Sequence, residues 1–376
     1  MGGEKTGSKS IRRKKVSIFP YAEIEGDSYE IGFQHGKIFK RQIEGTIKCY
    51  KHMFMDYSEL PWDRAKELSK RFIEPIRLYN EDYLEEIRGV AKGAGLDFEE
   101  ILALNCRSEL VFVGKEFDKT EGGCTSIGIT SDKAMNGEAI CAHNWDWKTS
   151  QRENMIMMKI RQKNGKPTIF MVTEAGIIGK TGFNSAGINV YLNALSTNQA
   201  PSGIPLHIAM RAVSDCETLA EAISALTRMP LGCCANFMLG HKNGECIDIE
   251  IENEDFDVLY PKDGIIVHTN HFISPKLPIH PRKDTTKYKL PDSFVRLGRA
   301  DKRLRQRQTR ISIEDVMEVL RDHVEYPHSI CRHNDPKAEP GLRLGTVFSI
   351  VVNLTRGDIY FCKGNPCETE YEIYHI

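Results

Sequence analysis

The sequence predicts an α+β protein folded as a four-layer αββα sandwich, in which two sheets face each other between two layers of helices. Three observations indicate this fold. The first third of the chain carries helical patterns, and period-two runs typical of strands begin directly after Gly122-Gly123-Cys124. Two helical patterns then interrupt the strands, and two further helices precede a hairpin near the end of the chain.

The folded part is expected to begin with a strand at residues 21–25, followed by a helix at residues 29–55 that Asp27 or Ser28 can cap. Amphipathic stretches predict three more helices, at residues 62–73, 80–93 and 97–105. Two glycines on the first helix mark positions where another backbone can approach closely, Gly32 and Gly36.

The rest of the chain alternates strands with helices. Strands are predicted at residues 125–129, 139–143, 155–160, 168–173 and 188–192, with hairpin turns at Asn136-Gly137 and Asn164-Gly165. Helices at residues 205–213 and 218–227 precede strands at residues 236–239, 246–252, 257–260 and 265–269. A surface loop at residues 276–290, helices at residues 293–307 and 312–322, and a hairpin of strands at residues 346–353 and 358–362 complete the chain. Ser312 and Asp315 resemble a capping box.

Composition and charge argue against several classes of protein. The chain has 376 residues with 51 basic and 52 acidic side chains, so no global field favours nucleic acid. Its apolar windows are far shorter than the roughly 20 residues of a membrane span. The N-terminus is polar and basic, without the apolar core of a secretory signal. We therefore expect a cytoplasmic protein whose 11 cysteines are mostly free thiols.

The two ends of the chain bear on its location. Residues 1–20 are typical of a disordered basic tail. The alternative is N-myristoylation at Gly2, for which the basic cluster at residues 12–15 could supply the second membrane signal. The C-terminal Tyr374-His375-Ile376 is not a peroxisomal signal.

The sharpest local motif is Gly122-Gly123-Cys124, where helical patterning gives way to strands. Two glycines permit an open backbone, and a thiol there can attack the Gly123 carbonyl and form a thioester, whose hydrolysis frees the Cys124 amine. An α-amine has a pKa of about 7.7 to 8.0, so it can accept the thiol proton near neutral pH. The alternative is a simple turn with Cys124 as a small buried apolar residue.

Seven short motifs follow one another in order from about residue 21 onward. They are Gly26-Asp27-Ser28-Tyr29 with Gly32 and Gly36, Gly123-Cys124-Thr125-Ser126, Asn144-Trp145-Asp146-Trp147, Thr173-Glu174-Ala175-Gly176-Ile177-Ile178-Gly179-Lys180, Gly182-Phe183-Asn184-Ser185-Ala186-Gly187, His268-Thr269-Asn270-His271 and Ser329-Ile330-Cys331-Arg332. In this order and spacing the chain resembles the acyl-coenzyme A:6-aminopenicillanic acid acyltransferase family, also called peptidase family C45, of N-terminal nucleophile (Ntn) hydrolases. It also resembles insect β-alanyl-amine hydrolases.

This resemblance implies that the chain cleaves itself between Gly123 and Cys124, and that Cys124 is then the catalytic nucleophile. It divides one Ntn domain into a mainly helical chain, residues 21–123, and a catalytic chain, residues 124–376. The two fragments are expected to stay associated through the apolar faces of the helices.

Three further catalytic residues follow from the same resemblance. Asp146 would orient the new α-ammonium, Asn270 would donate to the tetrahedral oxyanion, and Arg332 would order Asp146 or bind a substrate carboxylate. Taken alone, Asp146 could be a surface residue on an aromatic hairpin, Asn270 a turn residue and Arg332 a solvated cation.

The implied activity is cleavage or formation of an amide bond of a small N-acyl amine through a Cys124 thioester. One alternative is a coenzyme A-dependent acyltransferase of the 6-aminopenicillanic acid type, with acyl-CoA as substrate; another is an inactive Ntn-fold interaction protein. We expect no metal and no organic cofactor, because Cys233-Cys234 lack a zinc-binding frame. His268 and His271, which flank Asn270, are expected to be structural. The family suggests a serine near Cys233-Cys234, where substrate specificity could differ.

Overall fold

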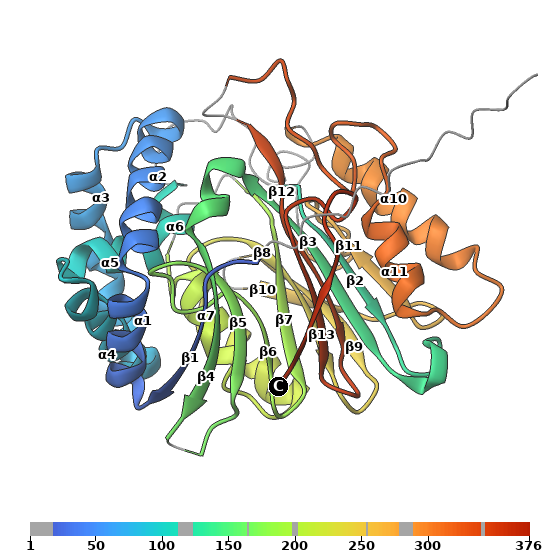
Figure 1. Cartoon of the computed structure of the whole chain (residues 1–376), viewed down its shortest axis with the longest axis horizontal. Helices are drawn as coiled ribbons and strands as arrows, with labels where there is room; N and C mark the ends of the chain where they lie inside the picture. Colours follow the sequence, from blue (N-terminus) through green and yellow to red (C-terminus); the bar gives the residue numbers. More distant parts are fainter. Residues whose placement is uncertain are drawn as a thin grey trace, which may run out of the picture.

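The structure is a computed structural model that describes residues 18–111, 123–163, 165–197, 202–252, 255–277, 289–339 and 343–376. Two sheets lie face to face, with α1 to α6 on one side and α10 and α11 on the other (Figure 1). The predicted four-layer αββα sandwich is therefore confirmed. Among the described residues, no helix is both long and apolar enough to cross a membrane.

The N-terminal segment forms one strand and a layer of helices. These are β1 (Tyr21–Gly26), α1 (Ser28–Ile38), α2 (Lys40–Ser58), α3 (Trp62–Ser69), α4 (Ile73–Ala94), α5 (Phe98–Asn105) and α6 (Arg107–Val111). Asp27 caps α1 in a capping box with Glu30. The prediction of one helix over residues 29–55 is wrong, because the chain bends at Phe39. The bend lets α1 pack along α4 while α2 contacts the turn before β4.

The glycines of α1 allow its backbone to touch that of α4. A Cβ atom on Gly32 would lie 2.0 Å from the Glu86 carbonyl oxygen, and one on Gly36 would lie 2.1 Å from that of Val90. No side chain fits at either distance. The predicted close approach of another backbone at these two glycines is confirmed.

The first sheet has eight strands in the order β1-β4-β5-β6-β7-β8-β9-β10. β1 pairs in parallel with β4, so the N-terminal segment supplies an edge strand. The other strands are antiparallel, and α7 and α8 also pack on this sheet. The bounds are β4 (Met155–Gln162), β5 (Ile169–Glu174), β6 (Thr181–Asn184), β7 (Ile188–Ala194), α7 (Leu206–Val213), α8 (Leu219–Thr227), β8 (Ala235–His241), β9 (Cys246–Glu252) and β10 (Asp255–Leu259).

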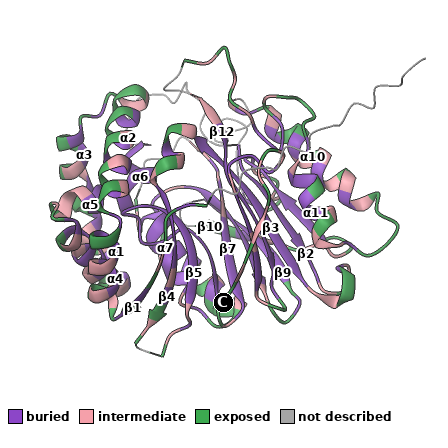
Figure 2. Cartoon of the chain, in the orientation of Figure 1, coloured by how far each residue is buried: buried purple, intermediate pink, exposed green. Residues whose placement is uncertain are grey.

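The second sheet has six strands in the order β11-β2-β3-β12-β13-β14. Its elements are β2 (Thr125–Ile129), β3 (Ile140–Lys148), β11 (Ile265–His268), α10 (Asp292–Arg305), α11 (Ile313–Leu320), β12 (Leu344–Asn353), β13 (Asp358–Lys363) and β14 (Glu372–His375). Every residue of β2 and β3 is buried, because the first sheet covers one face and α10 and α11 cover the other (Figure 2). One apolar core cluster extends from the N-terminal helices through the two sheets, and a second lies between the second sheet and α10 and α11.

Some predicted features lie outside the described residues. These are the tail up to residue 17 with Gly2, Gly122, Asn164 and most of the loop at residues 276–290. Within the described residues, β6, β14 and α6 were not predicted, whereas the Ser312–Asp315 capping box and the Asn136-Gly137 turn are confirmed. β3 runs five residues past its predicted end at residue 143, because Asn144 to Lys148 pair with β12.

Candidate active site

Cys124 lies at the beginning of β2, between two strands that deliver the other candidate residues. β3 pairs with β2 so that Thr125 faces Asn144, which brings Asp146 next to Cys124. On the other side, β11 pairs His268 with Ser126 and leads into Asn270. The Cys124 Sγ lies 3.9 Å from the Asp146 carbonyl oxygen. The candidate residues are therefore brought together by strand pairing and not by closeness in sequence.

The Cys124 thiol is buried, with 3% of the residue exposed. Burial raises the pKa of this thiol to about 11, and the Asp146 carboxylate adds to the rise, while Arg296 and Lys180 oppose it. At neutral pH the thiol of the intact chain is therefore protonated. A base must take its proton before it can attack a carbonyl.

Asp146 is fully buried, not exposed on a hairpin. Its Oδ1 accepts a hydrogen bond of 2.7 Å from the Thr346 hydroxyl, and its Oδ2 lies 3.3 Å from the Arg332 Nε. Burial raises the pKa of this carboxyl to about 7, although Arg332 and the hydrogen bond from Thr346 act in the opposite direction. Asp146 is thus a carboxyl group poised to change charge near neutral pH.

Arg332 is buried and links the backbone of Gly123 to two carboxylates. Besides Asp146, its guanidinium pairs with Asp292, and its Nη1 donates to His328 Nδ1 at 2.9 Å. A Cβ atom on Gly123 would lie 2.2 Å from the Arg332 Nε. The guanidinium therefore packs directly on the Gly123 backbone, and only glycine fits there.

Asn270 reaches Cys124 through Arg296, a residue that sequence reasoning missed. Arg296 Nη1 donates to the Cys124 carbonyl oxygen at 2.6 Å, and Nη2 donates to Asn270 Oδ1 at 3.1 Å. Because a guanidinium only donates, Asn270 must turn its oxygen toward Arg296 and its NH₂ group away. One N–H of that group meets the Ala194 carbonyl oxygen at 3.1 Å. The second N–H is the one that could serve an oxyanion.

Asp292 holds both arginines of the site. Its Oδ2 accepts from Arg296 Nε at 2.8 Å and also from Arg332. Burial alone would raise the pKa of Asp292, but the two arginines lower it below its ordinary value. Asp292 and Arg296 stand four residues apart on α10, and this spacing was the only sequence signal for either residue.

A second buried ionic group lies beside the site. Lys180 Nζ is 2.8 Å from Glu174 Oε2 and 3.9 Å from the centre of the Trp145 ring. Arg107, from the N-terminal segment, lies 3.0 Å from the same carboxylate oxygen. Burial alone would raise the pKa of Glu174, but Arg107 and Lys180 hold it at about 2. Burial lowers the pKa of Lys180 to about 8.

The other residues that the sequence singled out occupy structural positions. His268 Nε2 lies 2.8 Å from Glu250, and His271 Nδ1 lies 2.8 Å from the Ser293 hydroxyl. Cys233 Sγ lies 3.4 Å from the buried Glu109 carboxylate. All three therefore take part in local side-chain networks.

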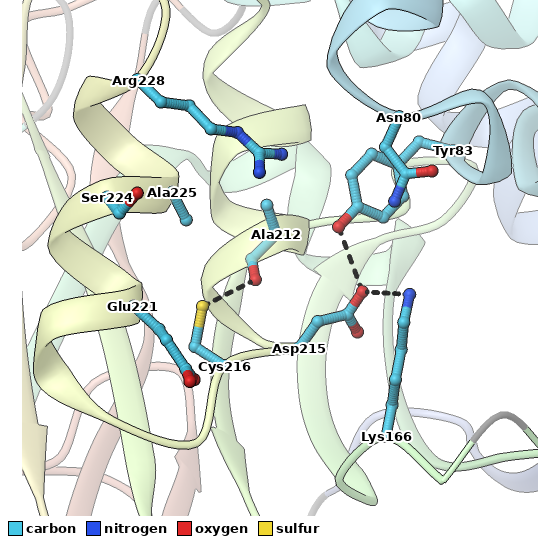
Figure 3. Close-up of a pocket in the computed structure, with 10 residues that line it drawn as sticks. All are labelled: Asn80, Tyr83, Lys166, Ala212, Asp215, Cys216, Glu221, Ser224, Ala225 and Arg228. Atoms are coloured by element: carbon cyan, nitrogen blue, oxygen red, sulfur yellow. Dashed lines mark hydrogen bonds and ion pairs between the residues drawn. The ribbon is translucent and has the colours of Figure 1, made fainter.

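One pocket lies away from these residues, in the helical layer against the first sheet (Figure 3). It measures about 300 Å³ and is lined by ten residues, Asn80, Tyr83, Lys166, Ala212, Asp215, Cys216, Glu221, Ser224, Ala225 and Arg228. Tyr83 and Lys166 both donate to Asp215, at 3.0 and 2.9 Å. None of the candidate catalytic residues lines this pocket.

Two facing sheets between helical layers, with a buried cysteine at the start of an inner strand, define an N-terminal nucleophile fold. Comparison with known proteins points to one family. Residues 133–368 match the family described as acyl-coenzyme A:6-aminopenicillanic acid acyl-transferase. The chain is 32% identical over 334 residues to the acyl-coenzyme A:6-aminopenicillanic-acid-acyltransferase 40 kDa form of Emericella nidulans, covering 88% of each chain. The chain therefore belongs to this family.

More distant similarities extend to other organisms. An uncharacterized protein of Archaeoglobus fulgidus is 22% identical over 319 residues, covering 73% of this chain and 52% of that protein. Among solved structures, a penicillin V acylase from Agrobacterium tumefaciens matches 64% of this chain and 83% of its own at 14% identity, with a TM-score of 0.41. A conjugated bile acid hydrolase variant from Clostridium perfringens matches 67% and 97% at 14% identity, with a TM-score of 0.43.

Proposed function

We propose that the chain activates itself by cleavage between Gly123 and Cys124. The Cys124 thiol gives its proton to the Asp146 carboxylate and attacks the Gly123 carbonyl carbon. The proton then passes to the Cys124 nitrogen as the C–N bond breaks and the acyl group moves to sulfur. Water then hydrolyses the thioester, leaving a carboxylate on Gly123 and a free amine on Cys124. The observation that carries this proposal is the packing of Arg332 on Gly123 beside the buried thiol.

Asp146 acts in both states of the protein. With a pKa of about 7, it can accept a proton from the thiol in the intact chain. After cleavage, the same carboxylate orients the new α-ammonium of Cys124. The free α-amine has an ordinary pKa of about 7.7 to 8.0 and replaces Asp146 as the base that serves the thiol. Arg332 keeps the Asp146 carboxyl group in place.

The cleaved enzyme takes the acyl group of a small N-acyl amine onto Cys124. Attack on the substrate carbonyl produces a tetrahedral oxyanion, which the second Asn270 N–H stabilises. Collapse expels the amine, which takes the proton that the Cys124 α-amine had accepted from the thiol, and leaves an acyl thioester. Water then releases the acid in the hydrolase direction, and another amine takes the acyl group in the transferase direction.

The second candidate function is acyl transfer from a coenzyme A thioester, with acyl-CoA as substrate. The name of the Emericella relative favours it. The two reactions share the nucleophile and the oxyanion donor, so the site residues do not separate them. Neither reaction needs a redox or metal cofactor.

We also propose that the cleaved segments stay together and that the protein works in the cytoplasm. The cleaved segments, residues 21–123 and 124–376, remain associated because β1 is an integral edge strand of the first sheet. The eleven cysteines all lie in the described part of the chain and form no disulfide there, which suits the reducing cytoplasm.

The test is to trap the acyl-enzyme. Cleaved protein is mixed with a panel of N-acyl amines and acyl-CoAs, quenched with acid, and analysed by mass spectrometry under denaturing conditions. The fragment that begins at Cys124 should gain the mass of the acyl group, and free amine or CoA should appear. Cys124→Ala should show neither, whereas Cys49→Ser, which changes a partly buried thiol elsewhere, should behave as wild type. Absence of any adduct or turnover across the panel would favour the inactive interaction protein.

A further inference from the structure

Four side chains that the proposed reaction does not use meet between two loops. His323, Cys331 and His333 lie in the loop between α11 and β12, and Cys367 lies in the turn that follows β13. One ligand atom from each, an imidazole nitrogen or a thiol sulfur, lies within 4.8 Å of all the others. Two thiols and two imidazoles are the donors that zinc prefers in structural sites.

Four of the six separations between these atoms are close to the edges of a tetrahedron around zinc, and the other two are no longer than 4.8 Å. The two sulfurs are 3.5 Å apart, and the Nε2 atoms of His323 and His333 are 3.1 Å apart. The His333 Nε2 lies 3.7 Å from Cys331 Sγ and 3.3 Å from Cys367 Sγ. With bonds of about 2.3 Å to sulfur and about 2.0 Å to nitrogen, a tetrahedral zinc needs about 3.8 Å between sulfurs, about 3.3 Å between nitrogens and about 3.5 Å for mixed pairs.

We propose that His323, Cys331, His333 and Cys367 bind one Zn²⁺ ion. Four protein ligands fill a tetrahedral shell and leave no position for substrate, so the site is structural. The proposal departs from the expectation of no metal, which considered Cys233-Cys234 and the pair His268 and His271 but not these four residues. The local signal was Cys331-Arg332-His333, whereas His323 stands earlier in the same loop and Cys367 follows β13.

Surrounding groups support the ligands as outer partners of a metal site do. The Asn365 Nδ2 donates to Cys331 Sγ at 3.5 Å, which stabilises a thiolate. The His333 Nδ1 lies 3.7 Å from the Glu368 carboxylate, on the side of the ring opposite Nε2. A cavity of about 260 Å³, lined in part by His333, Asn365 and Glu368, borders the cluster.

Two explanations of the cluster without a metal account for its contacts less well. A Cys331–Cys367 disulfide needs a sulfur separation of about 2.05 Å, well below the observed 3.5 Å. A hydrogen bond between two neutral imidazoles would account for the contact between His323 and His333. It would not account for two thiols placed around the same imidazole nitrogen.

The zinc site would fix the backbone that carries Arg332. Two of its ligands are the residues on either side of Arg332. The Arg332 N–H donates to the Thr346 hydroxyl at 3.0 Å, and its carbonyl accepts from Asn365 Nδ2 at 2.7 Å. The metal would therefore stabilise the loop that holds Arg332 on Gly123. This consequence depends on the proposed role of Arg332, whereas the metal site itself does not.

The experiment measures zinc in the full chain. Protein is expressed with ZnCl₂, purified without chelators, and analysed by inductively coupled plasma mass spectrometry. About one zinc per chain is expected. His323→Gln and Cys367→Ser should lose at least half of it. His52→Gln and Cys49→Ser, which change an exposed histidine and a partly buried thiol elsewhere, should retain it.

Cobalt gives a second readout that does not depend on activity. Apoprotein titrated with CoCl₂ should show the thiolate charge-transfer and visible bands of tetrahedral Co²⁺, and Cys367→Ser should weaken the charge-transfer band. Metal-free wild type that binds neither ion would overturn the proposal. So would a native Cys331–Cys367 disulfide in peptide mapping. The zinc measurements do not depend on self-cleavage. A protein that cleaves itself without binding metal would overturn only the zinc proposal, and one that binds metal without cleaving itself would overturn only the cleavage proposal.

Discussion

The backbone at Gly123 is sterically restricted, unlike that of a residue in a flexible linker. The side chain that limits it is Arg332, whose guanidinium occupies the space that a Cβ atom would need. Arg332 is itself held by Asp146 and Asp292, so it cannot move aside without breaking a buried ion pair. Glycine is therefore required at position 123, the proposed cleavage site, for steric reasons.

Gly123→Ala should slow self-cleavage by roughly 100-fold or more, because displacement of the scissile carbonyl by about 1 Å can cost that much. Gly298→Ala is the matched control, since a Cβ atom at Gly298 would meet nothing within 4 Å. The fraction of cleaved chain is followed over time on denaturing gels. Equal rates in the two variants would mean that Arg332 does not constrain the site.

The charge on Asp146 should make stability depend on pH. Its folded pKa of about 7 lies above the unfolded value, so its protonated form favours folding. This contribution is complete below about pH 3.9 and is lost as pH rises through about 7. In a Cys124→Ala background, the free energy of unfolding should fall more steeply from about pH 5 to about pH 8 than in Cys124→Ala/Asp146→Asn. Urea titrations at each pH measure this, and parallel curves would contradict the raised pKa.

At the scale of elements, the N-terminal segment is built into the sandwich. β1 is the edge strand of the first sheet, and Arg107 of α6 reaches the buried Glu174 at the end of β5. The Asn105 side chain also bonds to the backbone of Gly176 and Ile178. These contacts explain why the two fragments should separate in denaturant and not in high salt.

Arg107→Ala should destabilise the uncleaved Cys124→Ala protein by about 3–5 kcal/mol, because it removes one partner of a buried ion pair. Arg77→Ala, which removes an exposed pair with Glu74, should cost less than about 1 kcal/mol. Chemical denaturation of both variants gives the comparison. Similar losses of stability in the two variants would show that the buried ion pair contributes no more than the exposed one.

Helices and strands were predictable where one face is apolar or a turn is marked. Asp27, Asn136-Gly137 and the Ser312–Asp315 capping box appear where the sequence places them. The break between α1 and α2 was not predictable, because Phe39 is an ordinary helix residue and the bend depends on packing against α4. β14 was missed because a short edge strand carries little pattern of its own.

At the scale of the whole molecule, the site depends on partners that no local spacing reveals. The family resemblance predicted Cys124, Asp146, Asn270 and Arg332, and the structure brings all four into one network. The family resemblance gave no indication of Arg296, which lies on α10 and joins Asn270 to the Cys124 carbonyl oxygen. The proposed zinc ligands were missed for the same reason, since Cys367 is far along the chain from Cys331.

Removal of the proposed zinc should destabilise the whole chain. Treatment with a strong chelator should lower the melting temperature of wild type by at least about 2 °C, since a bound ligand stabilises the state that binds it. His323→Gln should melt at the lower temperature with or without chelator. Differential scanning calorimetry measures both proteins. An equal response to chelator in the two proteins would count against a metal at these residues.

Self-cleavage is the central claim, and intact mass under denaturing conditions tests it most directly. Purified wild type and Cys124→Ala are incubated side by side and sampled over time. Wild type should separate into two masses that meet between Gly123 and Cys124, while Cys124→Ala stays whole. A wild-type chain that keeps its full-length mass after prolonged incubation, or a Cys124→Ala chain cut at the same bond, would contradict the account.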